Sequence, residues 1–393
     1  MRVLSYLLPL MTCSALAQTW TQLPDFPGTA RDDAASFTIG NKIFVGTGME
    51  IGWGLTNDWW CFDAATDSWS AITAMPATPR QYCAAFTVND TGYVFGGVDG
   101  NGALNELWAY YPASDQWAQK SPMPAEARYA CAAVEGWNYG IVATGMLQSG
   151  APTKEAWKYI PATDSWQAMN PVPGPSRHRA VAFLDGGGML ITGGADSTGT
   201  ALSDAWSYPI WFETGMYYPR APLPAGRIDA KSGAPYVMVV AGGASDASTF
   251  HDDAWDGTSL TWNALPSFPA GPRRGAVGAG IPHTWSNAFY FGLGLSITDR
   301  HKDWWRLDFP TGIQESVVPG LLLYPNPVQG SVTITGIPDR AQVRVVDALG
   351  RVVLHETMDP GDPMDVRTLS PGQYLVVAGD GTVILRGELI KAP

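Results

Sequence analysis

An internal repeat of about 49 residues constrains the fold of this 393-residue chain more than any other feature. Each unit contains an acidic residue followed two positions later by tryptophan. The tryptophans of these pairs are spaced by 48, 49, 49, 49 and 50 residues: Trp60, Trp108, Trp157, Trp206, Trp255 and Trp305. One unit of this size cannot bury its own hydrophobic face, so the sequence predicts six similar units that pack on one another.

Three further features recur in the same order within the units. One is an arginine shortly after a proline: Arg31, Arg80, Arg128, Arg177, Arg227, and Arg273 or Arg274. Another is a glycine pair that ends an apolar run, clearest at Gly96-Gly97, Gly193-Gly194 and Gly242-Gly243. The last is a tryptophan that closes the unit: Trp20, Trp69, Trp117, Trp166 and Trp262. A degenerate unit without this last tryptophan lies near Met216–Tyr217.

The second unit shows how one repeat folds. Four short apolar or alternating runs, separated by turn residues, predict four antiparallel strands: Tyr82–Val88, Gly92–Phe95, Leu107–Tyr111 and Gln116–Gln119. The first run of several units is rich in alanine, which suits the crowded centre of a radial arrangement. The pattern resembles the kelch repeat, which implies an all-β, six-bladed β-propeller over residues 18–310.

The two ends of the repeat region predict how the ring closes. The sixth unit supplies three strands and stops, whereas Trp20–Leu23 is a single strand with no preceding partners. Pairing that strand with the sixth unit would complete the last blade and remove an open sheet edge.

Residues 1–17 have the features of a cleaved secretory signal peptide. Arg2 precedes an apolar run, and Ala15-Leu16-Ala17 fits the small-x-small cleavage pattern. Lipidation at Cys13 is the alternative. No apolar run is long enough to span a membrane, and the net charge of −12 argues against nucleic acid as a partner.

The repeat features end near Pro310, and a linker at residues 311–320 precedes a different composition at 321–393. Six or seven short strands predict a small Ig-like β-sandwich there. The order of Tyr324-Pro325-Asn326-Pro327, Gly350-Arg351, Asp365-Val366 and the Leu369–Tyr374 segment resembles the type A sorting domain of the type IX secretion system. The resemblance implies the secretion translocon as a partner and release to the surface of a Gram-negative bacterium through the periplasm. An ordinary Ig-like binding module is the alternative.

The repeated arginines are the candidate ligand-binding residues. In an up-and-down blade, the segment before the first strand and the loop after the glycine pair lie on one face. We therefore expect a ring at one mouth of the channel, with His178 beside it: Arg31, Arg80, Arg128, Arg177, Arg227 and Arg274. The ligand would be an anionic glycan or acidic peptide, since guanidinium binds carboxylate in a forked geometry. Alternatively, each arginine stabilises its own blade.

No catalytic, metal or cofactor motif can be mapped onto the chain, so we predict no cofactor and favour a binding or adhesion module. Resemblance to exported, six-bladed sialic-acid-epimerase-like kelch proteins leaves an enzyme acting on acidic carbohydrates as the alternative. Asp99, Asp196 and Asp246 are read as turn residues, with a Ca²⁺ site as the alternative. Four tryptophans lie outside the repeat frame and are candidates for exposed, sugar-stacking positions: Trp53, Trp137, Trp211 and Trp285.

Overall fold

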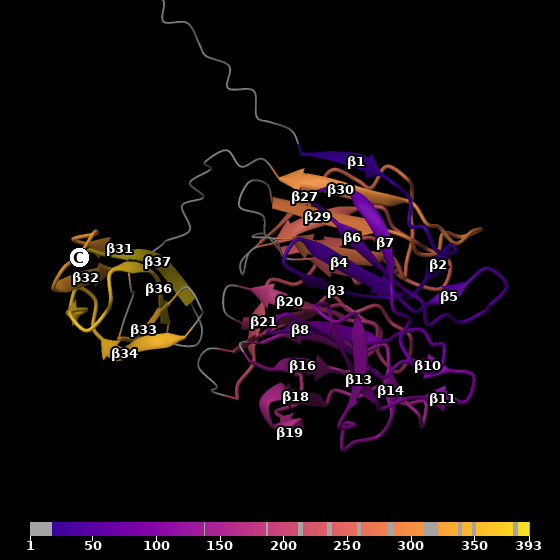
Figure 1. The fold of residues 1–393 in the computed structure, drawn as a ribbon, viewed down its shortest axis with the longest axis horizontal. Coiled ribbons are helices and arrows are strands. Elements are labelled where there is room, and N and C mark those ends of the chain that lie inside the picture. Colours follow the sequence, from indigo (N-terminus) through magenta and orange to yellow (C-terminus); the bar gives the residue numbers. More distant parts are fainter. Residues whose placement is uncertain are drawn as a thin grey trace, which may run out of the picture.

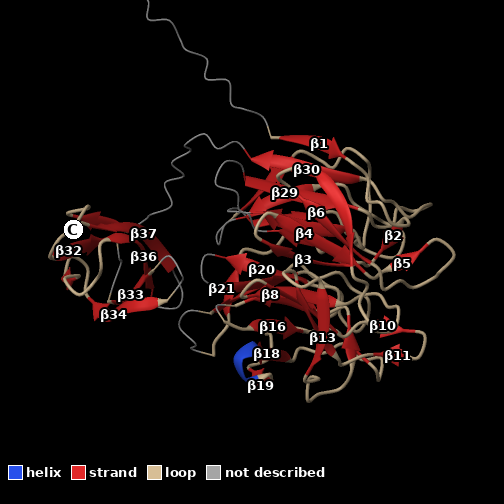
Figure 2. Ribbon diagram, viewed as in Figure 1, coloured by secondary structure: helices blue, strands red, loops and turns tan. Residues whose placement is uncertain are grey.

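A computed structural model describes residues 18–136, 138–185, 188–210, 215–233, 238–257, 261–281, 287–309, 321–336, 340–347, 351–379 and 384–392. Strands dominate, and the one short helix in this part of the chain is the 3-10 turn η1 (Pro161–Thr163) (Figure 2). Six four-stranded antiparallel sheets follow one another between residues 19 and 309 (Figure 1). The prediction of six four-stranded blades is therefore confirmed.

Each blade runs from an inner to an outer strand. Blade 1 is β3 (Ala35–Ile39), β4 (Lys42–Gly46), β6 (Trp59–Asp63) and β7 (Ser68–Ile72). Blades 2 and 3 are β8 (Ala84–Val88), β9 (Thr91–Phe95), β12 (Leu107–Tyr111) and β13 (Gln116–Lys120), then β15 (Ala132–Glu135), β16 (Gly140–Ala143), β18 (Ala156–Ile160) and β19 (Ser165–Met169). The strand positions expected for the second unit agree with blade 2 to within two residues.

Blade 4 is β20 (Val181–Asp185), β21 (Gly188–Thr192), β22 (Ala205–Pro209) and β23 (Tyr218–Arg220). Blade 5 is β24 (Lys231–Gly233), β25 (Met238–Ala241), β26 (Ala254–Gly257) and β27 (Trp262–Leu265). Blade 6 is β28 (Val277–Ile281), β29 (Asn287–Gly292), β30 (Trp304–Phe309) and β1 (Thr19–Leu23).

The ring closes as the sequence predicts. Strand β1 pairs antiparallel with β30, from Thr19 opposite Asp308 to Leu23 opposite Trp304, and the indigo and orange strands lie side by side in Figure 1. The closing tryptophans add contacts between blades, because each indole N–H donates to a backbone carbonyl of the preceding blade: Trp20 to Pro266, Trp69 to Pro24, Trp117 to Thr73, Trp166 to Ser121 and Trp262 to Ala221. These tryptophans are therefore structural.

The predicted meeting of two loop sets at one mouth is also confirmed. The segments that carry the arginines pair with the loops after the glycines, as in the ladders of β2 (Arg31–Asp32) with β5 (Met49–Glu50) and of β14 (Arg128–Tyr129) with β17 (Met146–Leu147). Blade 2 has a further ladder in its glycine-following loop, between β10 (Val98–Asp99) and β11 (Gly102–Ala103). Bridges of the same kind join His178 to Ala195 and Arg274 to Leu295.

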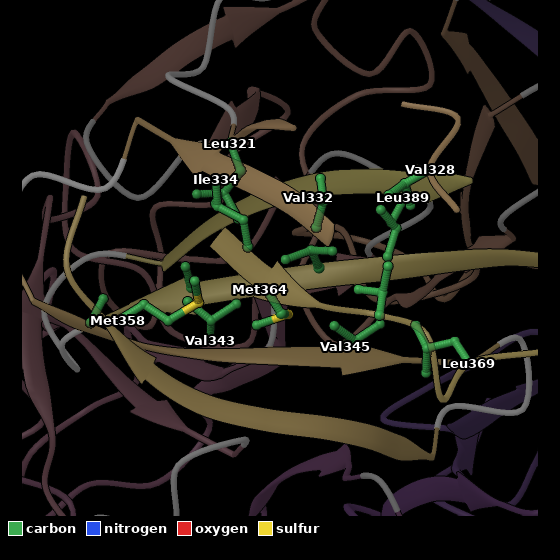
Figure 3. Close-up of a cluster of buried hydrophobic side chains, with 14 residues drawn as sticks. Leu321, Val328, Val332, Ile334, Val343, Val345, Met358, Met364, Leu369 and Leu389 are labelled. Atoms are coloured by element: carbon green, nitrogen blue, oxygen red, sulfur yellow. The ribbon is translucent and has the colours of Figure 1, made fainter. Parts of the chain in front are cut away.

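The C-terminal unit consists of two sheets. One has the order β31 (Leu322–Tyr324), β32 (Ser331–Thr335), β35 (Pro363–Asp365). The other has the order β34 (Val352–Met358), β33 (Ala341–Val346), β36 (Gly372–Gly379), β37 (Ile384–Lys391). Side chains from both sheets form one buried apolar core, which includes Val332, Val343 and Met364 (Figure 3). The alternation of buried and exposed residues in β32 and β33 is what a half-buried strand requires.

Several sequence predictions concern residues outside the described part of the chain. They are the signal peptide at 1–17, the linker at 311–320, and Trp137, Trp211 and Trp285. Within the described residues, no helix has the length and apolar character needed to cross a membrane.

Candidate functional site

The repeated arginines are buried and already paired. Six of them have relative exposures of 0 to 3%: Arg31, Arg80, Arg128, Arg177, Arg227 and Arg273. Each forms an ion pair at 2.5 to 2.7 Å with the acidic residue of its own blade: Asp58, Glu106, Glu155, Asp204, Asp253 and Asp303. In blade 6 the repeated position is Arg273, whereas Arg274 occupies the next position.

Blade 4 shows why these residue types recur together. Arg177 donates to both carboxylate oxygens of Asp204 and to the carbonyl of Gly193, and the Trp206 indole N–H donates to the same carboxylate. Burial opposes ionisation of Asp204, but its hydrogen bonds to Arg177 and Trp206 outweigh that effect and lower its pKa. Three of the repeated features, namely the arginine, the glycine pair and the acid–tryptophan pair, therefore meet around one buried guanidinium, which supports the interpretation that each arginine stabilises its own blade.

The second glycine of each pair recurs for a different, steric reason. Gly194 has φ +91°, and an added Cβ would lie 2.7 Å from the carbonyl oxygen of His178. Equivalent close approaches occur at Gly97 and Gly243. The glycine thus allows the loop to pass against the segment that enters the channel.

Two residues after each repeated arginine, the backbone forms what we call the collar. All six collar residues have φ between +52° and +58°: Asp33, Tyr82, Ala130, Arg179, Asp229 and Gly275. Each donates its backbone N–H to the carbonyl of the collar residue in the preceding blade at 2.8 to 3.3 Å, and Asp33 closes the circle by donating to Gly275. The collar is therefore a closed ring of hydrogen bonds in which the side chains differ from blade to blade.

Five of the six collar residues line a cavity of about 210 Å³ on the propeller axis. Its walls below the collar are the small residues of the innermost strands, including Ala84, Ala132 and Ala182, together with Lys231. The alanine-rich first strands thus leave an open channel, and the collar places charged side chains at its end.

Two collar-region arginines share one carboxylate. Arg179 Nε lies 3.4 Å and Arg274 Nη1 lies 3.2 Å from the same oxygen of Asp229, which is only 4% exposed. The Tyr82 hydroxyl accepts a hydrogen bond from Arg179 Nη2 at 2.8 Å, and the guanidinium lies over the Tyr82 ring. Three cationic side chains, Arg179, Arg274 and Lys231, outnumber the carboxyl groups of Asp33 and Asp229, so this end of the cavity is positive in a protein of net charge −12. Arg179 and Arg274 keep 27% and 22% of their side chains exposed.

Asp33 is a buried carboxyl group without a full set of partners. It is 3% exposed, and its Oδ1 has no hydrogen bond. Burial, and then the charges of Asp229 and Asp32, raise its pKa well above the usual value, while Lys231 and Arg274 oppose the shift. Burial, and then the charges of Asp33 and Asp229, also raise the pKa of Tyr82. These shifts favour the neutral, protonated form of both groups beside the cavity.

The predicted histidine and the other sequence candidates occupy different environments. His178 is half-buried at the mouth, and burial together with Arg179 lowers its pKa to about 4. Asp99, Asp196 and Asp246 accept hydrogen bonds from backbone N–H groups two to four residues ahead, as turn-forming aspartates do. Among the described residues, no cluster of histidine, cysteine and acidic side chains could hold a metal ion.

Sequence reasoning missed the residues that line the cavity, namely Asp33, Tyr82, Arg179 and Asp229. It followed the side chains that recur, and these are the ones that stabilise the blades. A usable signal was present two residues further on, where the repeat frame is constant but five residue types occupy the six blades. Positions of that kind are free to carry a function that the fold does not require.

Comparisons with known proteins agree with this architecture. Residues 10–194 match the family model described as the KLHDC2/KLHL20/DRC7 Kelch-repeats domain, and residues 322–391 match the model described as the secretion system C-terminal sorting domain. A solved structure entitled "Structure of YjhT" has a TM-score of 0.62 and 16% identity, covering 72% of this chain and 95% of that chain. At this identity the likeness concerns the fold. No curated protein matches the sequence.

Proposed function

We propose that this kelch-repeat β-propeller, which carries a C-terminal type IX sorting domain, is an exported module that binds a carboxylate-bearing glycan or acidic peptide at the collar. The observation that carries the proposal is the sharing of Asp229 by Arg179 and Arg274. Arg179 lines the cavity, Arg274 reaches the same Asp229 oxygen, and both keep part of their side chains exposed. A ligand carboxylate would balance their charge. This assigns binding to Arg179 and Arg274 and stability to the buried, repeated arginines.

Export follows from the C-terminal domain, which points to type IX secretion to the cell surface or beyond. We further propose a route through the periplasm of a Gram-negative bacterium, with cleavage after Ala17 and recognition of residues 321–393 by the translocon. Mass spectrometry of the exported protein tests the route. A chain recovered only inside the cell with Met1 retained would contradict it.

The binding proposal is tested by titration calorimetry of the purified full chain with two probes, tetragalacturonate and pentaglutamate. We expect at least one probe to bind at about 50 mM salt and to bind more weakly at about 500 mM, where charges are screened beyond a few ångströms. Arg179→Gln and Arg274→Gln should each weaken that binding about tenfold, since a charged hydrogen bond contributes about 1.5–3 kcal/mol.

Arg306→Gln is the matched control. Arg306 is 25% exposed and ion-paired, as Arg179 and Arg274 are, but it pairs with Asp67 and Asp308 away from the collar. Its substitution should leave binding within about twofold. Failure of both probes to bind the unaltered chain, or equal losses in all three variants, would overturn the proposal.

Asp33 favours a second candidate function, an enzyme acting on acidic carbohydrates. A buried carboxyl group whose pKa is raised, beside two arginines, combines a candidate proton donor with groups that can hold a sugar carboxylate. A screen for anomerisation, epimerisation or hydrolysis of uronic and sialic acids tests it. Turnover that disappears in Asp33→Asn while binding persists would support the enzyme. Binding of these sugars without turnover would favour the binding module over the enzyme.

A further inference from the structure

Trp53 is an exposed aromatic side chain in a strained backbone conformation. It is 76% exposed and has φ +68°, a region that bulky residues rarely adopt. It follows Gly52, which has φ +85°, in a turn closed by hydrogen bonds from Trp53 N to Glu50 O and from Glu50 N to Gly54 O. The turn extends from β5, whose ladder with β2 fixes it to the segment that enters the channel. Strain of this kind persists only where the surrounding structure enforces it.

The indole is also held from one side. The guanidinium of Arg300 lies over the Trp53 ring at 5.0 Å from its centroid. Arg300 is only 9% exposed, and its Nε donates to the buried Asp32 carboxylate at 2.5 Å. Arg300 comes from blade 6 and Asp32 from blade 1, so the support joins neighbouring blades. One face of the indole is occupied by the cation, and the large exposed fraction leaves the ring accessible to a ligand.

This support connects the indole to the cavity. Asp32 is directly followed by Asp33, which belongs to the collar and lines the cavity with Arg179 and Asp229. Trp53 is therefore placed on the mouth face, at the rim of the positively charged site. An apolar platform beside a positive site fits a ligand that has both an apolar face and a negative charge.

We infer that Trp53 is an aromatic subsite that stacks on a sugar ring, and that the ligand of the collar is an acidic oligosaccharide. The inference rests on the proposed function and extends it. The face of a pyranose ring presents C–H groups, which carry partial positive charge and match the negative face of an indole. A uronate unit at Arg179 and Arg274 would leave a neighbouring unit of the same chain for Trp53. A peptide would offer the carboxylates without the flat C–H face.

The test compares a monosaccharide with an oligosaccharide by titration calorimetry on the full chain, with galacturonic acid and tetragalacturonate as probes. Trp53→Ala should weaken tetragalacturonate binding about tenfold and leave galacturonic acid binding within about twofold. Trp53→Phe, which keeps an aromatic face, should retain most of the affinity of the unaltered chain for tetragalacturonate. The melting temperature should not change, because the side chain is exposed.

Ile51→Ala is the matched control. Ile51 lies in the same turn and is 72% exposed, but its side chain is aliphatic. Equal losses in Ile51→Ala and Trp53→Ala would indicate a general apolar contact and overturn the inference, as would unchanged tetragalacturonate binding in Trp53→Ala. Pentaglutamate binding that depends on Arg179 and Arg274, without binding of tetragalacturonate, would also overturn it while sustaining the proposed function. If the binding of neither probe is weakened by substitution of Arg179 or Arg274, the proposed function itself is refuted.

Discussion

The repeated arginine and the collar residue two positions after it have opposite properties. In blade 4, Arg177 is fully buried, pairs with Asp204 in its own blade, and has a counterpart in every other blade. Arg179 is partly exposed to the cavity, reaches Asp229 of blade 5, and is the only arginine in the collar. Residues that recur in every blade therefore stabilise the fold, whereas positions with a fixed backbone conformation but a variable side chain are available for function. Changes in the first set should cost stability, and changes in the second should affect the site.

The largest effect should come from deleting residues 18–23, which belong to the repeated framework. Blade 6 would lose its outer strand and the ring would lose the Trp20 contact to blade 5. Burial of Trp20 and Leu23 alone corresponds to about 3 kcal/mol or more. Thermal unfolding of the deletion variant measures the effect. An unchanged melting temperature would show that β1 does not close the ring.

Arg177→Ala should lower the free energy of unfolding by about 2–3 kcal/mol. This is less than the roughly 3–5 kcal/mol typical of a fully buried pair, because the Asp204 side chain is 34% exposed and can be hydrated. Arg179→Ala, two residues away, is the comparison variant and should lose much less stability. Urea unfolding measures both, and a greater loss in Arg179→Ala would reverse the proposed division.

Gly275→Ala should destabilise the collar by about 1–2 kcal/mol. Alanine is disfavoured at φ +58°, and its Cβ would lie 2.4 Å from Asp33 Oδ1. Ala130→Gly is the matched change at an equivalent position with φ +52°. Glycine relieves the backbone strain of the positive φ but loses more conformational entropy on folding, so the two effects should nearly cancel. Denaturant unfolding of the pair isolates the steric contact. Equal stability of the two variants would show that the contact with Asp33 does not exclude a side chain at Gly275.

The remaining prediction concerns the pH dependence that Asp33 imposes on stability. Because its folded pKa is raised, the folded chain holds a proton that the unfolded chain releases as the pH rises above about 4. The stability from that proton is complete below about pH 4 and is lost as the pH rises through the raised pKa. Asp33→Asn should remove this decline.

His178 acts in the opposite direction in an overlapping range. Its pKa is lowered to about 4, so its contribution to stability is lost as the pH falls from about 6.5 to 4. Melting temperatures measured from pH 4 to 8 should therefore be compared between Asp33→Asn and the unaltered chain. Parallel curves for the two proteins would contradict the raised pKa of Asp33.

Much of the architecture could be predicted because it depends on local patterns. The spacing of Trp60 and its equivalents set the number of blades, and the unpaired strand at Trp20–Leu23 indicated the closure. The cavity residues could not be found in that way. The ion pairs of Arg179 and Arg274 with Asp229 join residues of different blades, and Asp33 is buried only because six collar segments converge on one axis.

By itself, the sequence determined the repeat, the strands and the ring closure, because alternation, turn residues and spacing can be read along the chain. The C-terminal sorting domain was indicated by the resemblance of its ordered motifs to that family. Only the tertiary structure decided which arginines are neutralised within their own blade and which share the Asp229 carboxylate. Arg273 and Arg274 are adjacent and chemically identical, yet one pairs with Asp303 in its own blade and the other with Asp229 of the preceding blade. Neighbouring side chains along a strand-like segment point in opposite directions, so the closed ring assigns them different partners.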